Sequence, residues 1–239
     1  MSYSPVASST GTFKWGQSGW KVWAFQLNFP EIVNGTYGAD GIFGDDTKAV
    51  VVAFQKTNRL YADGIAGPLT QEKLFLVRSD YAEKLFSLPP KLLASIGKGE
   101  SGYYTACVSG LTSDGGRDYG AYQDHLVNPT QEQLATAFTI ADLALDTAQN
   151  LRENKDRYYL GKKFVGAKTH QRAWELAALS HNWPYAAERL ALGLSIYASG
   201  DDVPRQWIID ATKGRLSTAN QWVAEQISTK TSLVTLWTP

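Results

Sequence analysis

The sequence predicts a mainly helical fold, with an α+β part that contains one short region of strands and loops. DGIFGDDT at residues 40–47 returns as DGIAGPLT at residues 63–70, with a stretch of helical periodicity between the two copies. Apolar residues also recur at helical spacing over residues 131–151. Residues 103–125, in contrast, are rich in Gly, Ser, Asp and Tyr without a helical period, which is typical of short strands and loops.

The repeat predicts a small helical bundle in the N-terminal part of the chain. A helix that contains the tripeptide AFQ, at residues 24–26 and again at 53–55, precedes each Asp-Gly turn. Apolar residues at i, i+3 and i+4 predict the buried face of each helix. These residues are Trp20, Trp23, Ala24 and Leu27 in the first helix and Val50, Ala53 and Phe54 in the second. In both copies the Asp-Gly pair favours a tight turn, and the Thr favours the N-cap of the next helix.

The doubled motif resembles the peptidoglycan-binding domain of the three-helix type, over roughly residues 14–76. In that family the glycan and its stem peptide lie near the first Asp-Gly loop. The resemblance therefore implies that Tyr37, Asp40 and Phe43 contact the cell wall. A turn-forming role for Asp40 and a core position for Phe43 are the alternatives.

The second part of the chain begins after a junction near Arg78, which predicts domains at residues 1–78 and 79–239. Pro89 and Pro90 cannot lie inside a helix and are expected to precede a new one. Residues 131–151 and 170–183 then show helical stripes, and a further helix is expected between Pro184 and Gly193.

Glu100 is the candidate for chemistry in this second part. It follows Leu93, Ile96 and Gly97 at i+7, i+4 and i+3, so it ends the buried stripe of a helix. A carboxyl group that loses hydration has a raised pKa and can serve as a general acid near neutral pH. Glycosidic cleavage requires such a proton donor. The alternative is an ordinary surface carboxylate at a helix end.

The residues after Glu100 resemble the lysozyme-like superfamily of goose-type lysozymes and lytic transglycosylases, over residues 85 to about 200. GES is followed by SDGGRDYGAYQDH, in which GAYQ stands where the family has GLMQ. The resemblance implies that Asp114 is a second acid that positions a water molecule. The family's further acid is replaced by His125 here, so Asp118 and Asp124 remain alternative second acids.

The same resemblance implies a set of substrate contacts. LSHNWPYAAERLA at residues 179–191 is similar to the family's AYNAG segment, with His181 in the Tyr position and Asn182 matching the Asn. Tyr122 lies in the closing motif and is expected to be a platform for a sugar ring. The implied substrate-binding residues are Ser101, Tyr119, Tyr122, Gln123, His181 and Asn182. A hydrogen-bonded core position is the alternative for His181.

Together the two parts resemble a modular bacteriophage endolysin. Such a glycoside hydrolase, a lysozyme or muramidase, cleaves the β-1,4 bond between N-acetylmuramic acid and N-acetylglucosamine and so lyses the host. The runner-up is a lytic transglycosylase that leaves 1,6-anhydromuramic ends. Less favoured is an enzyme that cuts the stem peptides, either a zinc amidase or a cysteine peptidase with Cys107 as nucleophile and His125 or His181 as base. A non-catalytic wall-binding protein is a further alternative.

The composition limits the partners. Lys and Arg together number 23, as do Asp and Glu, so no net positive charge attracts nucleic acid, and bacterial peptidoglycan is the expected partner. Without a signal peptide or a run of about 18 apolar residues, we expect no stable membrane insertion. We expect a monomer made in the host cytoplasm that reaches the wall after the membrane is permeabilised. The histidines lack a zinc-ligand pattern, so no metal or cofactor is expected.

Overall fold

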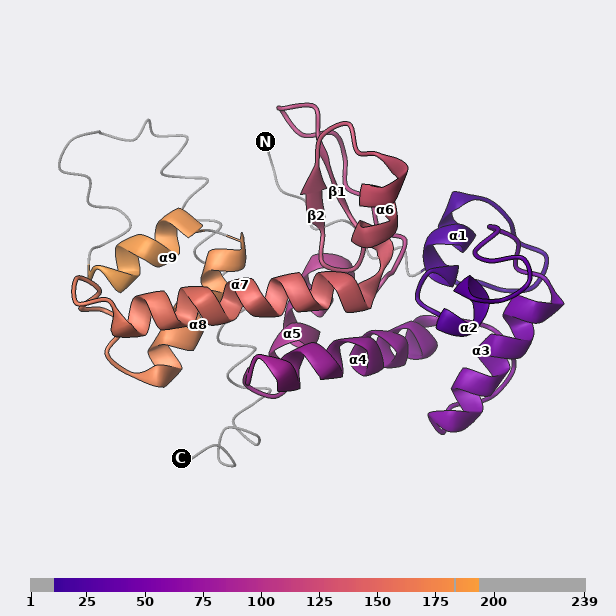
Figure 1. Ribbon diagram of the computed structural model, residues 1–239, viewed down its shortest axis with the longest axis horizontal. Coiled ribbons are helices and arrows are strands. Elements are labelled where there is room, and N and C mark those ends of the chain that lie inside the picture. Colours follow the sequence, from indigo (N-terminus) through magenta and orange to yellow (C-terminus); the bar gives the residue numbers. More distant parts are fainter. Residues whose placement is uncertain (1–10, 183, 194–239) are drawn as a thin grey trace. The chain divides into compact units, whose positions relative to one another are not determined.

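The computed structural model describes residues 11–182 and 184–193, and its described part is mainly helical (Figure 1). The helices are α1 (Trp20–Gln26), α2 (Pro30–Val33), α3 (Asp45–Thr57), α4 (Pro68–Leu85), α5 (Leu92–Ser101), α6 (Gln131–Phe138), α7 (Ile140–Leu160), α8 (His170–Asn182) and α9 (Pro184–Ala191). The strands are β1 (Arg117–Tyr119) and β2 (Asp124–Leu126). The predicted mainly helical fold class is confirmed.

The described residues pack into two compact units. The first unit contains residues 11–85 and 93–146, and the second contains residues 86–92 and the described residues from 147 onward. The predicted junction near Arg78 lies inside α4, which continues without a break to Leu85. The packing units therefore differ from the predicted domains at 1–78 and 79–239, because α4 packs with both the repeats and the segment that follows Leu93.

A buried glutamine organises the first Asp-Gly loop. Gln26, which ends α1, is 1% exposed. Its side-chain amide donates to Asp40 Oδ1 at 3.0 Å, to the Ile42 carbonyl at 3.1 Å and to Thr47 Oγ1 at 2.9 Å. Its Oε1 accepts a hydrogen bond from the Gly41 amide at 2.7 Å. Gly41 has a φ of 75°, a backbone conformation that a glycine adopts without strain.

Gln55 organises the second loop in the same way. Its side-chain amide donates to Asp63 Oδ1 at 3.0 Å, to the Ile65 carbonyl at 3.0 Å and to Thr70 Oγ1 at 3.1 Å. Its Oε1 accepts from the Gly64 amide at 2.9 Å. The two copies of the sequence repeat thus fold into two copies of one hydrogen-bond network.

These glutamines correct the predicted buried faces of the first two repeat helices. In α1 the buried residues are Val22, Ala24, Phe25 and Gln26, whereas Trp20 is half exposed. In α3 they are Thr47, Val51 and Gln55 rather than Val50, Ala53 and Phe54. Each helix is rotated so that its glutamine faces inward, where it satisfies the backbone of an Asp-Gly loop.

Residues 131–151 form two helices rather than the one stripe that the periodicity predicts. Thr139 separates α6 from α7 and has an extended backbone, with φ −90° and ψ 108°. Asn28 lies against this break: its side-chain amide donates to the Phe138 carbonyl at 3.0 Å, and its Oδ1 accepts from the Ile140 amide at 2.8 Å. A residue of the repeat region therefore satisfies the backbone groups that the break frees.

The two strands form a small antiparallel sheet that lies beside α6 (Figure 1). In its register Asp118 is opposite His125, and Tyr119 is opposite Asp124. An isolated bridge between Val108 and Tyr119 adds the preceding segment to the free side of β1. The predicted strand-and-loop character of residues 103–125 is confirmed.

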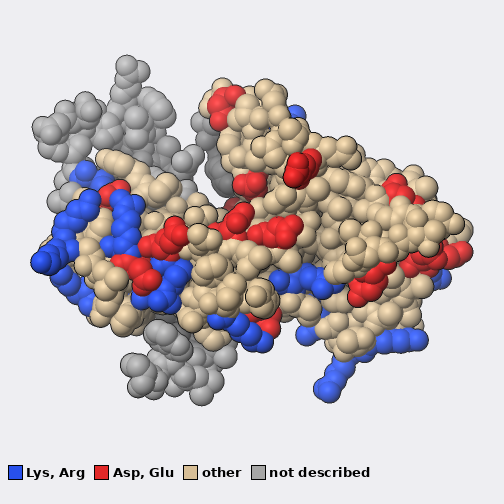
Figure 2. Space-filling model, viewed as in Figure 1, with Lys and Arg blue, Asp and Glu red and all other residues tan. Residues whose placement is uncertain are grey.

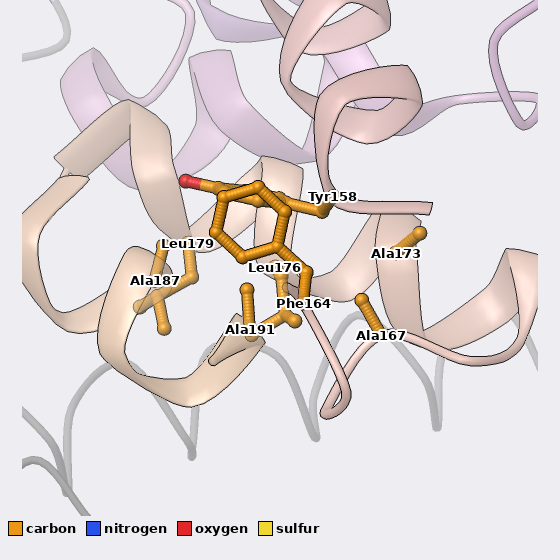
Figure 3. Packing of buried hydrophobic residues seen from close by; sticks show 8 residues of the cluster. All are labelled: Tyr158, Phe164, Ala167, Ala173, Leu176, Leu179, Ala187 and Ala191. Atoms are coloured by element: carbon orange, nitrogen blue, oxygen red, sulfur yellow. The ribbon is translucent and has the colours of Figure 1, made fainter. Parts of the chain in front are cut away.

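The second unit has its own apolar core (Figure 3). Tyr158 from α7 and Phe164 from the following loop meet edge to face, with ring centroids 5.2 Å apart. The remaining members of the cluster are Ala167, Ala173, Leu176, Leu179, Ala187 and Ala191. Gly193 follows α9 with a φ of 77°, which agrees with the predicted helix end.

Lys and Arg side chains gather over the end of α7 and the segment after it (Figure 2). Several pair with acids of the same unit: Arg152 with Asp156 at 2.7 Å, and Arg157 with Glu188 at 2.8 Å.

Among helices of residues 11–182 and 184–193, none is both long and apolar enough to cross a bilayer.

Candidate functional site

Glu100 lies in the last turn of α5, on the side of the helix that is buried. Leu93 and Ile96 of the same stripe are fully buried, as predicted. Glu100 itself is half-buried, at the margin between the core and solvent. The first turn of α5 is fixed by a hydrogen bond from the Leu93 amide to Glu83 Oε1 at 2.8 Å. Glu100 is therefore held on a helix whose first turn is fixed, and its side chain is not fully buried.

Ser101 connects the end of α5 to the GAYQ motif. Its hydroxyl is within hydrogen-bond distance of the Ala121 carbonyl, at 2.8 Å, and of the Gly97 carbonyl, at 3.2 Å. The side chain is buried. The structure therefore corrects the implied substrate contact: Ser101 faces the protein interior and holds the motif against the helix that carries Glu100.

Gly120 begins the motif at a point of close backbone approach. A Cβ atom there would lie 1.8 Å from the Ala137 carbonyl oxygen of α6, and its φ is 74°. Gln123 ends the motif and donates from its side chain to the Gly120 carbonyl at 2.9 Å. The motif is a tight turn that only glycine can begin.

Cys107 lies in the same neighbourhood as Glu100 and Gln123. Burial raises the pKa of its thiol to about 11, a hydrogen bond with Gln123 opposes that rise, and the charge of Glu100 adds to it. A buried thiol with a raised pKa is a poor nucleophile. The environment of Cys107 disfavours the cysteine-peptidase alternative.

Tyr122 is a core residue rather than a sugar platform. It is 3% exposed, its hydroxyl is 2.7 Å from Ser79 Oγ, and its ring packs on Phe75 at a centroid distance of 5.0 Å. Burial raises the pKa of its hydroxyl. The platform prediction is wrong because the turn at Gly120 directs this ring inward.

Tyr119 is half-buried, with its ring perpendicular to that of Phe138, and remains a predicted contact.

Asp114 lies on an exposed loop and is joined to His125. Its Oδ1 accepts from Thr112 Oγ1 at 2.6 Å and from the Gly116 amide at 3.0 Å. Its Oδ2 is 2.9 Å from His125 Nε2, and His125 Nδ1 is 2.7 Å from Asp118 Oδ1. The hydrogen bond from Thr112, with those from Gly116 and His125, lowers the pKa of Asp114, so this carboxyl group is ionised.

His125 is a site residue that the sequence reasoning missed. From the sequence, His125 is only a departure from the family pattern and a base for Cys107 in a less favoured alternative. The signal that could have found it is the pair of short strands: residues opposite each other in an antiparallel hairpin place Asp118 and His125 side by side.

Asp124, an alternative second acid, has a different environment. It is half-buried, and burial followed by the charge of Asp146 raises its pKa. Asp114 and Asp124 thus have pKa values that are shifted in opposite directions, which favours Asp114 as the ionised base.

His181 and Asn182 end α8 in the second compact unit. His181 is half-buried, and the side chain of Asn182 lies outside the described part of the chain. Both remain predicted contacts.

The three residues that the resemblance implies as wall contacts differ in their exposure to solvent. Tyr37 is 74% exposed, as a contact requires. Phe43 is fully buried and stacks on Phe25 at 6.1 Å, so it is a core residue and the predicted contact is wrong. Asp40 is exposed, but hydrogen bonds from Gln26 and then from the Ile42 amide lower its pKa, so its main role is to shape the turn.

Two exposed tryptophans beside this loop were also missed. Trp15 is 60% and Trp20 is 50% exposed, and Trp15 Nε1 donates to Asp45 Oδ1 at 3.0 Å. Backbone hydrogen bonds from Gly16 to Phe43 and from Gly19 to Gly41 hold their segment against the loop. The sequence pattern places Trp20 in a buried helical stripe and assigns no role to Trp15.

The region of the two Asp-Gly loops matches a known protein family. Residues 21–74 match the putative peptidoglycan-binding domain. The chain thus carries a peptidoglycan-binding domain, and the corresponding prediction is confirmed. The chain is also 44% identical over 55 residues to a probable N-acetylmuramoyl-L-alanine amidase of Bacillus licheniformis. That match covers 22% of this chain and 16% of the relative, so the chain spans only a small part of the relative's length.

The peptidoglycan-binding domain contains both glutamine networks and belongs to the same compact unit as Glu100. In residues 11–182 and 184–193, no group of three or more His, Cys, Asp or Glu side chains is placed to hold a metal ion.

Proposed function

We propose that the protein is a peptidoglycan glycosidase of the muramidase type, with Glu100 as general acid and Asp114 as the base that holds water. The observation that carries this proposal is the placement of a half-buried carboxyl group, at the end of a rigid helix, in one compact unit with a peptidoglycan-binding domain. The site requires no cofactor in this mechanism.

In the proposed reaction Glu100 donates its proton to the glycosidic oxygen that links N-acetylmuramic acid to N-acetylglucosamine. The bond to the anomeric carbon then breaks through a transition state of oxocarbenium character. Asp114, which is ionised, accepts a proton from the water that attacks this carbon. If the 6-hydroxyl of the muramic acid attacks instead, the product is the 1,6-anhydro sugar of a lytic transglycosylase.

The proposed setting is that of a bacteriophage endolysin. The peptidoglycan-binding domain supports the wall as the partner, and the exposed side chains of Tyr37, Trp15 and Trp20 offer aromatic faces for sugar rings. An enzyme of this kind would act on the host wall after the membrane is permeabilised.

A second candidate is amidase activity, cleavage between the muramic acid and the stem peptide. It is favoured by the similarity of 55 residues to a probable N-acetylmuramoyl-L-alanine amidase. The two reactions release different groups: a glycosidase frees sugar ends, whereas an amidase frees the amino terminus of the peptide.

The test is digestion of purified peptidoglycan by the purified chain, with mass spectrometry of the soluble products. We expect disaccharide peptides with reducing muramic acid ends. Anhydro ends, lighter by one water, would assign the transglycosylase reaction. Sugar-free peptides with new amino termini would assign the amidase reaction and contradict the glycosidase proposal.

Glu100→Gln serves as the variant and Glu132→Gln as its matched control. Glu132 is an exposed carboxylate in the first turn of α6, in the same compact unit, without a role in the proposed site. We expect Glu100→Gln to lose product release while Glu132→Gln keeps it. Equal activity of the two variants would remove Glu100 from the mechanism.

A further inference from the structure

His125 is bound by two carboxylates, one at each ring nitrogen. Nδ1 lies 2.7 Å from Asp118 Oδ1, and Nε2 lies 2.9 Å from Asp114 Oδ2. An ionised carboxylate only accepts hydrogen bonds, so both ring nitrogens must donate. A neutral imidazole has one N–H group, and this geometry therefore fits the imidazolium, which has two.

The two partners of His125 belong to different segments. Asp118 is its cross-strand neighbour in the hairpin, whereas Asp114 lies in the preceding loop. That loop is closed by a hydrogen bond from the Thr112 amide to the Gly116 carbonyl at 2.9 Å, and Thr112 Oγ1 lies 2.7 Å from the same carbonyl oxygen. The contact between Asp114 and His125 joins the loop to the sheet.

The loop is shaped to receive the ring. A Cβ atom at Gly116 would lie 2.6 Å from His125 Cε1 and 2.7 Å from Nε2, so only glycine lets the imidazole approach this closely. Asp114 uses Oδ1 for the loop and Oδ2 for His125, and its side chain is still 56% exposed. Water can therefore reach the carboxylate while its orientation is fixed.

We propose that His125, with a proton on both ring nitrogens, is a positioning residue that fixes the Asp114 carboxylate for wall cleavage, and that cleavage is lost when His125 becomes neutral. This inference rests on the proposed glycosidase function, in which Asp114 holds the attacking water. On losing one proton the ring can donate to only one of its two carboxylates, and the positive charge that holds the Asp114 carboxylate in place is gone.

The charged groups that face His125 define the pH range. Hydrogen bonds to Asp118 and then to Asp114 raise the pKa of His125 above its ordinary value, and Asp124, its chain neighbour, is also coupled to it by charge. A raised histidine pKa means that the contact is complete at low pH and is lost as pH rises through the folded-state value. The lowered pKa of Asp114 means that its carboxylate persists until strongly acidic pH.

The experiment combines two pH titrations of the full chain. NMR follows the His125 ring and the Asp114 carboxyl carbon. Cleavage is measured as the release of soluble fragments with new reducing ends from peptidoglycan. We expect the His125 midpoint above about 6.5, the ordinary histidine value. We also expect a second change of the Asp114 resonance at that midpoint and a fall of cleavage that coincides with it.

Asp118→Asn is the variant, because asparagine keeps the shape and an acceptor oxygen but removes one negative charge. It should lower the His125 midpoint and shift the alkaline limb of cleavage by the same number of pH units. Asp80→Asn is the control, since Asp80 is an exposed carboxylate of α4 paired with Lys84, and it should move neither midpoint.

An alkaline limb that stays in place while the His125 midpoint moves would overturn the proposal. So would an Asp114 resonance that does not respond at the His125 midpoint. The NMR titration needs no turnover, so it decides on the positioning role even if the digest yields no sugar ends, a result that would contradict only the proposed glycosidase function.

Discussion

Replacement of Gln26 by alanine tests the role of the buried glutamine network. The side chain makes four hydrogen bonds to one loop, with Asp40, Gly41, Ile42 and Thr47. Asp40 is exposed and keeps the Ile42 amide as a donor, and the Thr47 hydroxyl keeps the Ile42 carbonyl at 3.3 Å. The buried Gly41 amide loses its acceptor, which costs about 1–3 kcal/mol.

The lost methylene group adds to this cost. Alanine keeps the Cβ atom, so one buried CH₂ group, Cγ, is removed, which contributes about 0.8 kcal/mol. We therefore expect Gln26→Ala to lower the free energy of unfolding by about 2–4 kcal/mol. For a chain of this length that loss corresponds to a fall in Tm of roughly 4–16 °C.

Thermal unfolding followed by circular dichroism measures the effect. Gln55→Ala should cost about as much as Gln26→Ala, since Gln55 makes the same four contacts in the second loop. Gln149→Ala is the control, because Gln149 is exposed and its side-chain amide donates to Glu153, one turn away at the surface. A change in Tm for Gln26→Ala that equals that of Gln149→Ala would refute the reasoning.

Three further predictions concern the site and the wall contact. Glu100→Gln should lower the rate of product release by roughly a thousandfold, the range of a general acid, while cosedimentation with cell walls is unchanged. Gly120→Ala should cost more than about 3 kcal/mol in chemical denaturation, since its Cβ would lie 1.8 Å from the Ala137 carbonyl and its φ is 74°. Tyr37→Ala should weaken wall binding about fivefold without a change in Tm, because its ring is exposed. Phe43→Ala removes a buried ring and should lower Tm. The opposite pattern would show that Phe43 belongs to the binding surface.

Most helices could be predicted because their apolar residues repeat with a helical period. The stripe of α5 is an example: Leu93 and Ile96 are buried where the spacing places them. The rotation of α1 and α3 could not be predicted in this way. Periodicity assigns polar residues to the outside, whereas Gln26 and Gln55 are buried because the Asp-Gly loops supply partners for every polar atom of their amides.

The break at Thr139 was equally hidden from local sequence. Apolar residues keep the helical period across it, and the groups that satisfy its backbone come from Asn28, more than a hundred residues away in the chain. Propensity describes neighbours along the chain and carries no information on such a partner.

The site residues show the same difference between what the helical period predicts and what depends on partners distant in the chain. The position of Glu100 follows from the register of its helix, whereas Tyr122 and Ser101 are predicted substrate contacts only because they belong to motifs of the resemblance. Tyr122 and Ser101 are buried, since the turn at Gly120 directs the first inward and α5 binds the second. His125 became apparent only when the hairpin placed it opposite Asp118.

The contact of Asn28 with the α6–α7 break has a consequence for how the protein would move along a wall. A binding module on a flexible linker can sample many bonds around one anchoring point. Asn28 instead joins the peptidoglycan-binding domain to the segment between Phe138 and Ile140 within one compact unit. The peptidoglycan-binding domain and the candidate carboxylates would therefore move along the wall together. In the proposed function, the domain would have to dissociate from the wall before the carboxylates reach a new glycosidic bond. Very tight anchoring would slow such a protein rather than speed it.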